Sequence, residues 1–117
     1  MTITRNNPQA RLAASVTYGG LVYLSGQVPT DLSVDATAQT QDVLAKIDAL
    51  LAEANSDKTR ILSAQIWIKD MARDFAAFND VWEAWMPLGH SPARAAVQAE
   101  MARPEVLVEV MVTAAQK

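Results

Sequence analysis

The run Val106 to Val112 (VLVEVMV) constrains the fold of this chain more than any other stretch. Successive side chains of a β-strand point to opposite faces, so its four valines share one face, and Leu107, Glu109 and Met111 share the other. Both faces are therefore largely apolar, which predicts a central strand with material packed on each side. Glu109 in the middle of such a strand must face water, a partner or a ligand, because an unpaired buried carboxylate is costly.

Periodicity and turn residues predict the order β-β-β-α-β-α-β-β along the chain. The expected elements are a short edge strand at Met1–Thr4 broken by Asn6-Asn7-Pro8, strands Ser15–Tyr18 and Leu21–Ser25, a helix Ala36–Ala54, a strand Ile61–Lys69, a helix Phe75–Met86, and strands Ala93–Met101 and Val106–Val112.

Turn and cap residues support several of these boundaries. Gly19-Gly20 between two β-rich runs predicts a tight hairpin, because both turn positions need positive φ. Asp35 is suited to cap the start of the first helix, and Asn55 can take the left-handed conformation that closes it. Pro87 disfavours helical backbone at Met86, so the second helix is expected to end there.

The number of helices predicts an assembly. Two helices can cover only one face of a sheet of about this size, and the chain has no further element for the other face. We therefore expect a second subunit to supply the missing layer.

Composition narrows the class of protein. The 117 residues (1–117) fit one domain, half of them are hydrophobic, and there is no cysteine, which excludes disulfides and thiol chemistry. The net charge of −3 gives no electrostatic footprint for nucleic acid or membrane. A polar N-terminus without a long apolar run predicts a soluble cytoplasmic protein.

Few residues offer chemistry. The single histidine, His90, follows Gly89 in an expected loop. A Ser-His-Asp triad would need this histidine, but no serine lies in a GxSxG motif. No metal-ligand spacing or phosphate-binding loop is present, so neither a metal nor a cofactor is expected. Arg94 and Glu109 remain: they are either a structural ion pair, or an arginine that grips a substrate carboxylate and a glutamate that moves a proton. In the second case apolar neighbours would raise the pKa of Glu109.

An aromatic stripe marks the second predicted helix. Its members recur at helical spacing and are expected to pack in the core: Phe75, Phe78, Trp82 and Trp85.

Five segments in one order carry a family resemblance: LSGQVP (24–29), IWIKD (66–70), DFAAFNDVWEAW (74–85), PAR (92–94) and VEV (108–110), with the glutamate fifteen residues after the arginine. The chain resembles the Rid family, also called YjgF or L-PSP, and within it the RidA-like, YoaB-like branch. The resemblance implies an α+β, chorismate-mutase-like fold: a six-stranded mixed sheet with two helices on one face, and a homotrimer whose sheets form an inner barrel. The sites would then lie in clefts between subunits, so Arg94 and Glu109 need not meet within one chain.

The resemblance also implies an activity without a cofactor, the hydrolysis of reactive enamine and imine intermediates (2-imino acids) to 2-keto acids and ammonia. Arg94 would hold the substrate carboxylate, Glu109 would activate water, Ser25 and Gly26 would line the pocket, and Asn79 would match a family asparagine.

Two positions depart from the family pattern. Many deaminase members of the family have a tyrosine at about the position of Leu12, and Ala96 stands where the family has a cysteine. Both differences make the pocket more apolar. The alternative function is a small-carboxylate or 2-keto acid binding or regulatory protein with little turnover. A ribonuclease is disfavoured by the charge, and a holdase-like role has no support in the sequence.

Overall fold

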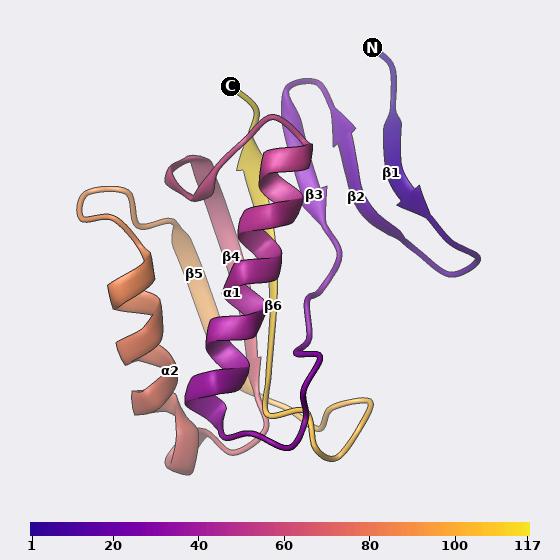
Figure 1. Cartoon of the computed structure of the whole chain (residues 1–117). Coiled ribbons are helices and arrows are strands. Elements are labelled where there is room, and N and C mark those ends of the chain that lie inside the picture. The colour runs from indigo at the N-terminus through magenta and orange to yellow at the C-terminus, as the bar shows by residue number, and fades with distance from the viewer.

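The computed structural model describes residues 1–117 and contains the elements in the predicted order (Figure 1). These are β1 (Thr4–Pro8), β2 (Ala13–Tyr18), β3 (Leu21–Leu24), α1 (Ala36–Glu53), a short 3-10 turn (Lys58–Arg60), β4 (Ile61–Ile68), α2 (Met71–Trp85), β5 (Ala93–Gln98) and β6 (Val108–Ala115).

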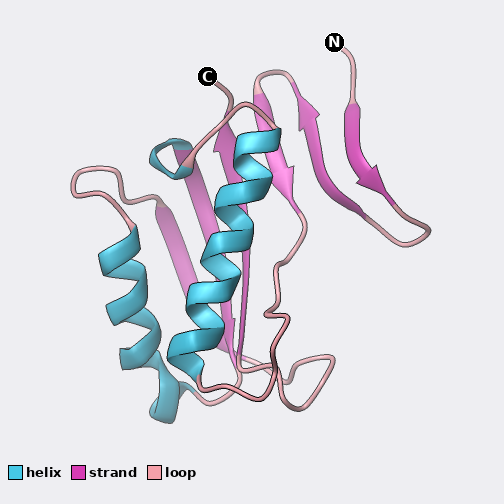
Figure 2. Ribbon diagram, viewed as in Figure 1, coloured by secondary structure: helices cyan, strands magenta, loops and turns pink.

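All six strands form one mixed sheet in the order β1-β2-β3-β6-β4-β5. Only β4 and β5 run parallel, since α2 connects them as a crossover, and every other pair is antiparallel. Both helices lie on the same face of this sheet, and the β1–β2 hairpin extends beyond the area that they cover (Figure 2). The predicted α+β class, with six strands and two helices on one face, is confirmed.

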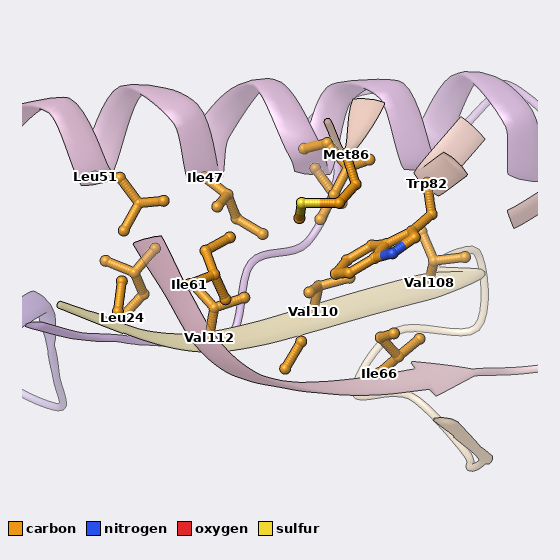
Figure 3. Close-up of a cluster of buried hydrophobic side chains, with 14 of the residues drawn as sticks. Leu24, Ile47, Leu51, Ile61, Ile66, Trp82, Met86, Val108, Val110 and Val112 are labelled. Carbon is orange, nitrogen blue, oxygen red and sulfur yellow. The ribbon is translucent and has the colours of Figure 1, made fainter. Parts of the chain in front are cut away.

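The core lies between the helices and the central strands (Figure 3). The predicted valine face of β6 is fully buried there, with Val108, Val110 and Val112 at most 1 % exposed. Helix α1 packs Ile47 and Leu51 against this face, and both side chains are inaccessible to solvent. This sandwich of aliphatic side chains fixes β6 at the centre of the sheet, as its sequence predicted.

The predicted turn and caps are confirmed. Gly19 and Gly20 have φ of 61° and 81°, and the strands pair in register on either side of them. The Asp35 side chain accepts a hydrogen bond from the backbone N–H of Ala38 at 3.0 Å. Asn55 has φ of 60° just beyond the end of α1.

The expectation for the N-terminus is wrong. The edge strand is not Met1–Thr4 but Thr4–Pro8, so the Asn6-Asn7-Pro8 segment forms part of it instead of breaking it. Strand β1 pairs only with β2, and a proline is tolerated on an edge because no second neighbour needs its N–H. Asn7 adopts φ of 50°, which asparagine tolerates better than most residues.

The start of the second helix is also earlier than predicted. Helix α2 begins at Met71, because Asp70 already caps it by accepting from the N–H of Arg73 at 3.1 Å. The predicted stop is confirmed, since Met86 leaves the helical region with ψ of 120°.

A β-bulge changes which side chains of β4 face the core. Strict alternation along this strand would put Leu62 on the same face as Ala64 and Ile66, but the register with β6 shifts between Ile61 and Ser63. The extra residue turns Ile61 inward and leaves Leu62 50 % exposed.

Strand β5 ends at Gln98, three residues earlier than predicted, and β6 begins at Val108, two residues later than predicted.

The sheet face opposite the helices is open in the single chain. Tyr23, Val97 and Met111 are 43 %, 45 % and 42 % exposed. No helix is long and apolar enough to cross a membrane.

Candidate active site

Arg94 lies on β5, the edge strand beside α2. It is paired in register with Ala64, a buried residue on the helix side of β4, so its side chain also points to that side. Its guanidinium donates a hydrogen bond to Oδ1 of Asn79 on α2 at 2.6 Å. The structure therefore joins two of the predicted site residues, Arg94 and Asn79.

Three aromatic rings of α2 lie beside the same guanidinium. Its central carbon is 5.3 Å from the ring centroid of Trp82, 5.8 Å from that of Phe78 and 6.0 Å from that of Phe75, within the range of cation–π attraction. We call these three residues the aromatic shelf. Their helical spacing predicted core packing, and the burial of Phe78 and Trp82 agrees with it. Helical spacing alone did not indicate that the shelf would also contact Arg94.

Glu109 lies on the opposite face of the sheet. It is paired in register with Trp67, while its neighbours Val108 and Val110 point into the core. The interpretation of Arg94 and Glu109 as a structural ion pair is excluded within the chain, because the only two salt bridges are Arg73–Asp74 and Lys117–Asp57. Strand β4 separates β5 from β6, so the two residues do not meet.

The Glu109 carboxylate is partly withdrawn from water. This burial raises the pKa of Glu109 above its usual value, as the apolar neighbours in the sequence predicted. A carboxylate with a raised pKa is a stronger base and accepts and returns protons more readily near neutrality.

Ser25 and Gly26 follow β3 directly, and Gly26 lies beside Glu109. The segment is held by paired backbone hydrogen bonds between Gln27 and Val110, at 2.8 and 3.1 Å. A Cβ atom placed on Gly26 would lie 3.2 Å from Cδ of Glu109 and closer still to Oε2. Only glycine leaves room for the carboxylate at this point, a contact that single-sequence reasoning did not detect.

Leu12 belongs to the Glu109 side of the site. It is 50 % exposed in the turn between β1 and β2. The backbone carbonyl of the next residue, Ala13, accepts a hydrogen bond from the Ser25 hydroxyl at 2.5 Å, which connects this turn to the Ser25–Gly26 segment.

Ala96 belongs to the Arg94 side. It follows Arg94 by two residues, so it shares the same face of β5, and it packs partly buried against the core. The predicted site residues thus form two groups in the single chain. We call Arg94, Asn79 and Ala96 the Arg94 group, and Glu109, Ser25, Gly26 and Leu12 the Glu109 group.

Neither concave region of the chain contains Arg94 or Glu109. One, of about 430 Å³, lies at the end of β4 and β5 and is bordered by Lys69, Asp70 and Arg73. The other, of about 300 Å³, is a groove between α1 and α2 that includes Trp85. A cleft that holds both chemical groups is therefore not formed by one chain. Nowhere do three histidine, aspartate or glutamate side chains gather as a metal site would require.

Comparisons with known proteins find relatives over nearly the whole chain. Residues 2–116 match the family model described as endoribonuclease L-PSP. The chain is 44 % identical over 113 residues to a RutC family protein of Haemophilus ducreyi, covering 97 % of this chain and 96 % of that one. It is 43 % identical over 115 residues to the RutC family protein YoaB of Escherichia coli, covering 98 % and 99 %. A crystal structure of a YjgF family member from Neisseria meningitidis superposes with a TM-score of 0.96 at 45 % identity, covering 100 % of this chain and 97 % of that one.

Proposed function

Since the chain belongs to the L-PSP family, whose members are also called Rid or YjgF proteins, we propose that it hydrolyses 2-imino acids to 2-keto acids and ammonia at clefts between subunits. The observation that carries the proposal is the contrast between the two groups. One presents an arginine that no carboxylate neutralises, and the other presents a glutamate whose pKa is raised by burial.

The two groups divide the reaction. A guanidinium binds a carboxylate through two parallel N–H donors, so Arg94 holds and orients the imino acid. As the water oxygen bonds to the imine carbon, Glu109 takes a proton from the water and passes it to the imine nitrogen, which gives a carbinolamine. Glu109 then takes the proton of the new hydroxyl and passes it to the amino nitrogen, the C–N bond breaks, ammonia leaves, and the oxygen remains as the carbonyl of the keto acid. Imine and water are consumed in equal number, and no electron acceptor is needed.

The proposal includes an assembly of subunits, because the two groups lie on opposite faces of one sheet, and the family resemblance implies that this assembly is a homotrimer. A second copy would bring its Glu109 group to the Arg94 edge of the first. The open face offers apolar side chains for such an assembly, Tyr23, Val97 and Met111 among them.

An oxidase-coupled assay tests this function. An amino-acid oxidase generates imines from a panel of amino acids, and semicarbazide traps those that survive. We expect wild type to deplete the imines, and Arg94→Ala and Glu109→Gln each to lose most of the rate. Arg94→Lys should be about as slow as Arg94→Ala, since an ammonium lacks the planar fork of a guanidinium. Exposed Arg103→Ala and Glu83→Gln are the matched controls and should behave as wild type. If semicarbazide traps the same amount of imine with and without the wild-type protein, the proposal is rejected.

The main rival is a 2-keto acid binding protein with little turnover. The same Arg94 would hold the ligand, and the apolar substitutions at Leu12 and Ala96 would be consistent with slow chemistry. Binding of 2-oxobutyrate without any imine hydrolysis would identify it.

The family description names an endoribonuclease, and this rival has less support here. The net charge is −3 and His90 is exposed in a loop, so neither a basic surface nor a histidine acid–base pair is present. RNA cleavage that persists through purification and disappears in Arg94→Ala would revive it.

A further inference from the structure

The Arg94 guanidinium is held in place without being neutralised. Its hydrogen-bond partner is an amide oxygen and its other neighbours are aromatic ring faces, while the chain's two ion pairs lie elsewhere. An exposed arginine side chain otherwise samples many rotamers, and it loses conformational entropy when a ligand immobilises it. An arginine that is already ordered avoids much of that cost.

Helix α2 provides all of these neighbours. Phe75, Phe78, Asn79 and Trp82 are spaced by three and four residues, so they project from one side of the helix toward β5. Trp82 is anchored in the core, where its ring lies between the helices and the strands (Figure 3). The shelf is therefore rigid, and Asn79 is carried on the same rigid element.

We propose that Asn79 and the aromatic shelf are positioning residues that set the orientation of Arg94 and keep its full charge for an anionic ligand. Asn79 then acts through Arg94, because its Oδ1 accepts the hydrogen bond that the guanidinium donates. The remaining N–H donors of Arg94 are free for a carboxylate. The assignment of the ligand rests on the proposed function, whereas the ordering of Arg94 does not.

Neutrality at position 79 is the specific requirement. Asparagine and aspartate are nearly isosteric, but an aspartate would form an ion pair with Arg94 and compete with the ligand. A hydrogen bond to a charged acceptor is stronger than one to a neutral acceptor, and we expect the competing aspartate to lower ligand affinity about tenfold, or roughly 1.4 kcal/mol.

Two measurements test the proposal on the full-length protein. The first is NMR of the Arg94 side chain without ligand. We expect slow guanidinium rotation and ring-current-shifted protons in wild type. Asn79→Ala should speed up the rotation, and Phe75→Leu should reduce the shifts while Trp82 stays in place. A role of Asn79 in stability alone would not change these signals.

The second measurement is the affinity for 2-oxobutyrate by calorimetry. We expect Asn79→Asp to weaken binding about tenfold and Asn79→Ala to weaken it less, because only the aspartate competes for the charge. Gln41→Glu makes the same amide-to-carboxylate change at an exposed position of α1 and is expected to bind as wild type does.

The outcomes separate the two proposals. A freely rotating, unshifted Arg94 in wild type, or one unchanged by Asn79→Ala, would overturn the positioning role. Equal 2-oxobutyrate affinity of Asn79→Asp and wild type would overturn the requirement for neutrality. An ordered Arg94 in a protein that neither binds 2-oxobutyrate nor hydrolyses imines would support positioning and reject the proposed function.

Discussion

Replacing Gly26 by alanine should impair catalysis without unfolding the protein. The new Cβ would come to 3.2 Å from Cδ of Glu109 and into steric overlap with Oε2. The backbone of Gly26 does not lie in the left-handed region, so alanine is tolerated locally and even restricts the unfolded chain, a gain of about 0.4–1 kcal/mol. The clash involves the end of a flexible side chain, which can rotate away at a cost of about 0.5–1.5 kcal/mol.

These two terms oppose each other, so the free energy of unfolding of Gly26→Ala should stay within about 1 kcal/mol of wild type. The carboxylate, however, must move by about 1 Å or more, and a misplacement of that size costs about 100-fold in rate. Chemical denaturation and the coupled imine assay measure the two effects separately. The expected pattern is a large loss of kcat in a protein of nearly normal stability.

A double-mutant cycle shows whether the effect passes through Glu109. In a Glu109→Ala background the alanine at position 26 has nothing to displace, so it should cause no further loss of rate. Gly26→Ala with full activity would mean that the carboxylate is not needed where the structure places it. An equal loss in both backgrounds would mean that Gly26 serves the site in another way.

Three further predictions concern pH, the hairpin and the open face. Burial raises the pKa of Glu109 in the folded state, so the folded protein holds this proton more tightly than the unfolded chain does. Wild type should therefore lose stability relative to Glu109→Gln as the pH rises above 4.5, the ordinary pKa of a glutamate, as measured by urea unfolding; an opposite trend would contradict the burial argument. Gly20→Ala has open space for the Cβ but a φ of 81°, so it should destabilise the fold by about 1–2 kcal/mol in the same measurement, and no change would contradict the strain. Met111→Lys should leave the secondary structure intact by circular dichroism but shift sedimentation from trimer to monomer and abolish imine hydrolysis, because it places a charge on the proposed interface; an unchanged trimer would place the interface elsewhere.

Features set by neighbouring residues could be predicted from the sequence. The Gly19-Gly20 hairpin and the Asp35 cap depend on chemistry within a few residues, and both are observed where expected. The valine face of β6 was predictable for a related reason, since alternation within one strand is enough to define it. The same reasoning was wrong for Asn6-Asn7-Pro8, which was expected to break the first strand. Whether a proline ends a strand depends on whether that strand has one neighbour or two.

Features set by contacts between distant segments could not be predicted. The bulge that exposes Leu62 exists only in the register between β4 and β6. The close approach of Gly26 to Glu109 joins residues far apart in the chain, as does the contact of Arg94 with Asn79. Arg94 and Glu109 could be chosen as candidate site residues from their cost in apolar strands, and Ser25, Gly26 and Asn79 from the family resemblance, but the contacts that these residues make required the structure.

The placement of Arg94 and Glu109 on opposite faces has a physical rationale. If the two charges met within one chain, they would form an ion pair, Glu109 would lose its raised pKa, and Arg94 would lose its free donors. Strand β4 keeps them apart, so each retains the property that the proposed reaction needs. On this view the active site forms only when subunits assemble, with a substrate carboxylate between Arg94 and the incoming glutamate. Dissociation of the trimer should then abolish imine hydrolysis while leaving the hydrogen bond between Arg94 and Asn79 intact, because that contact lies within one chain.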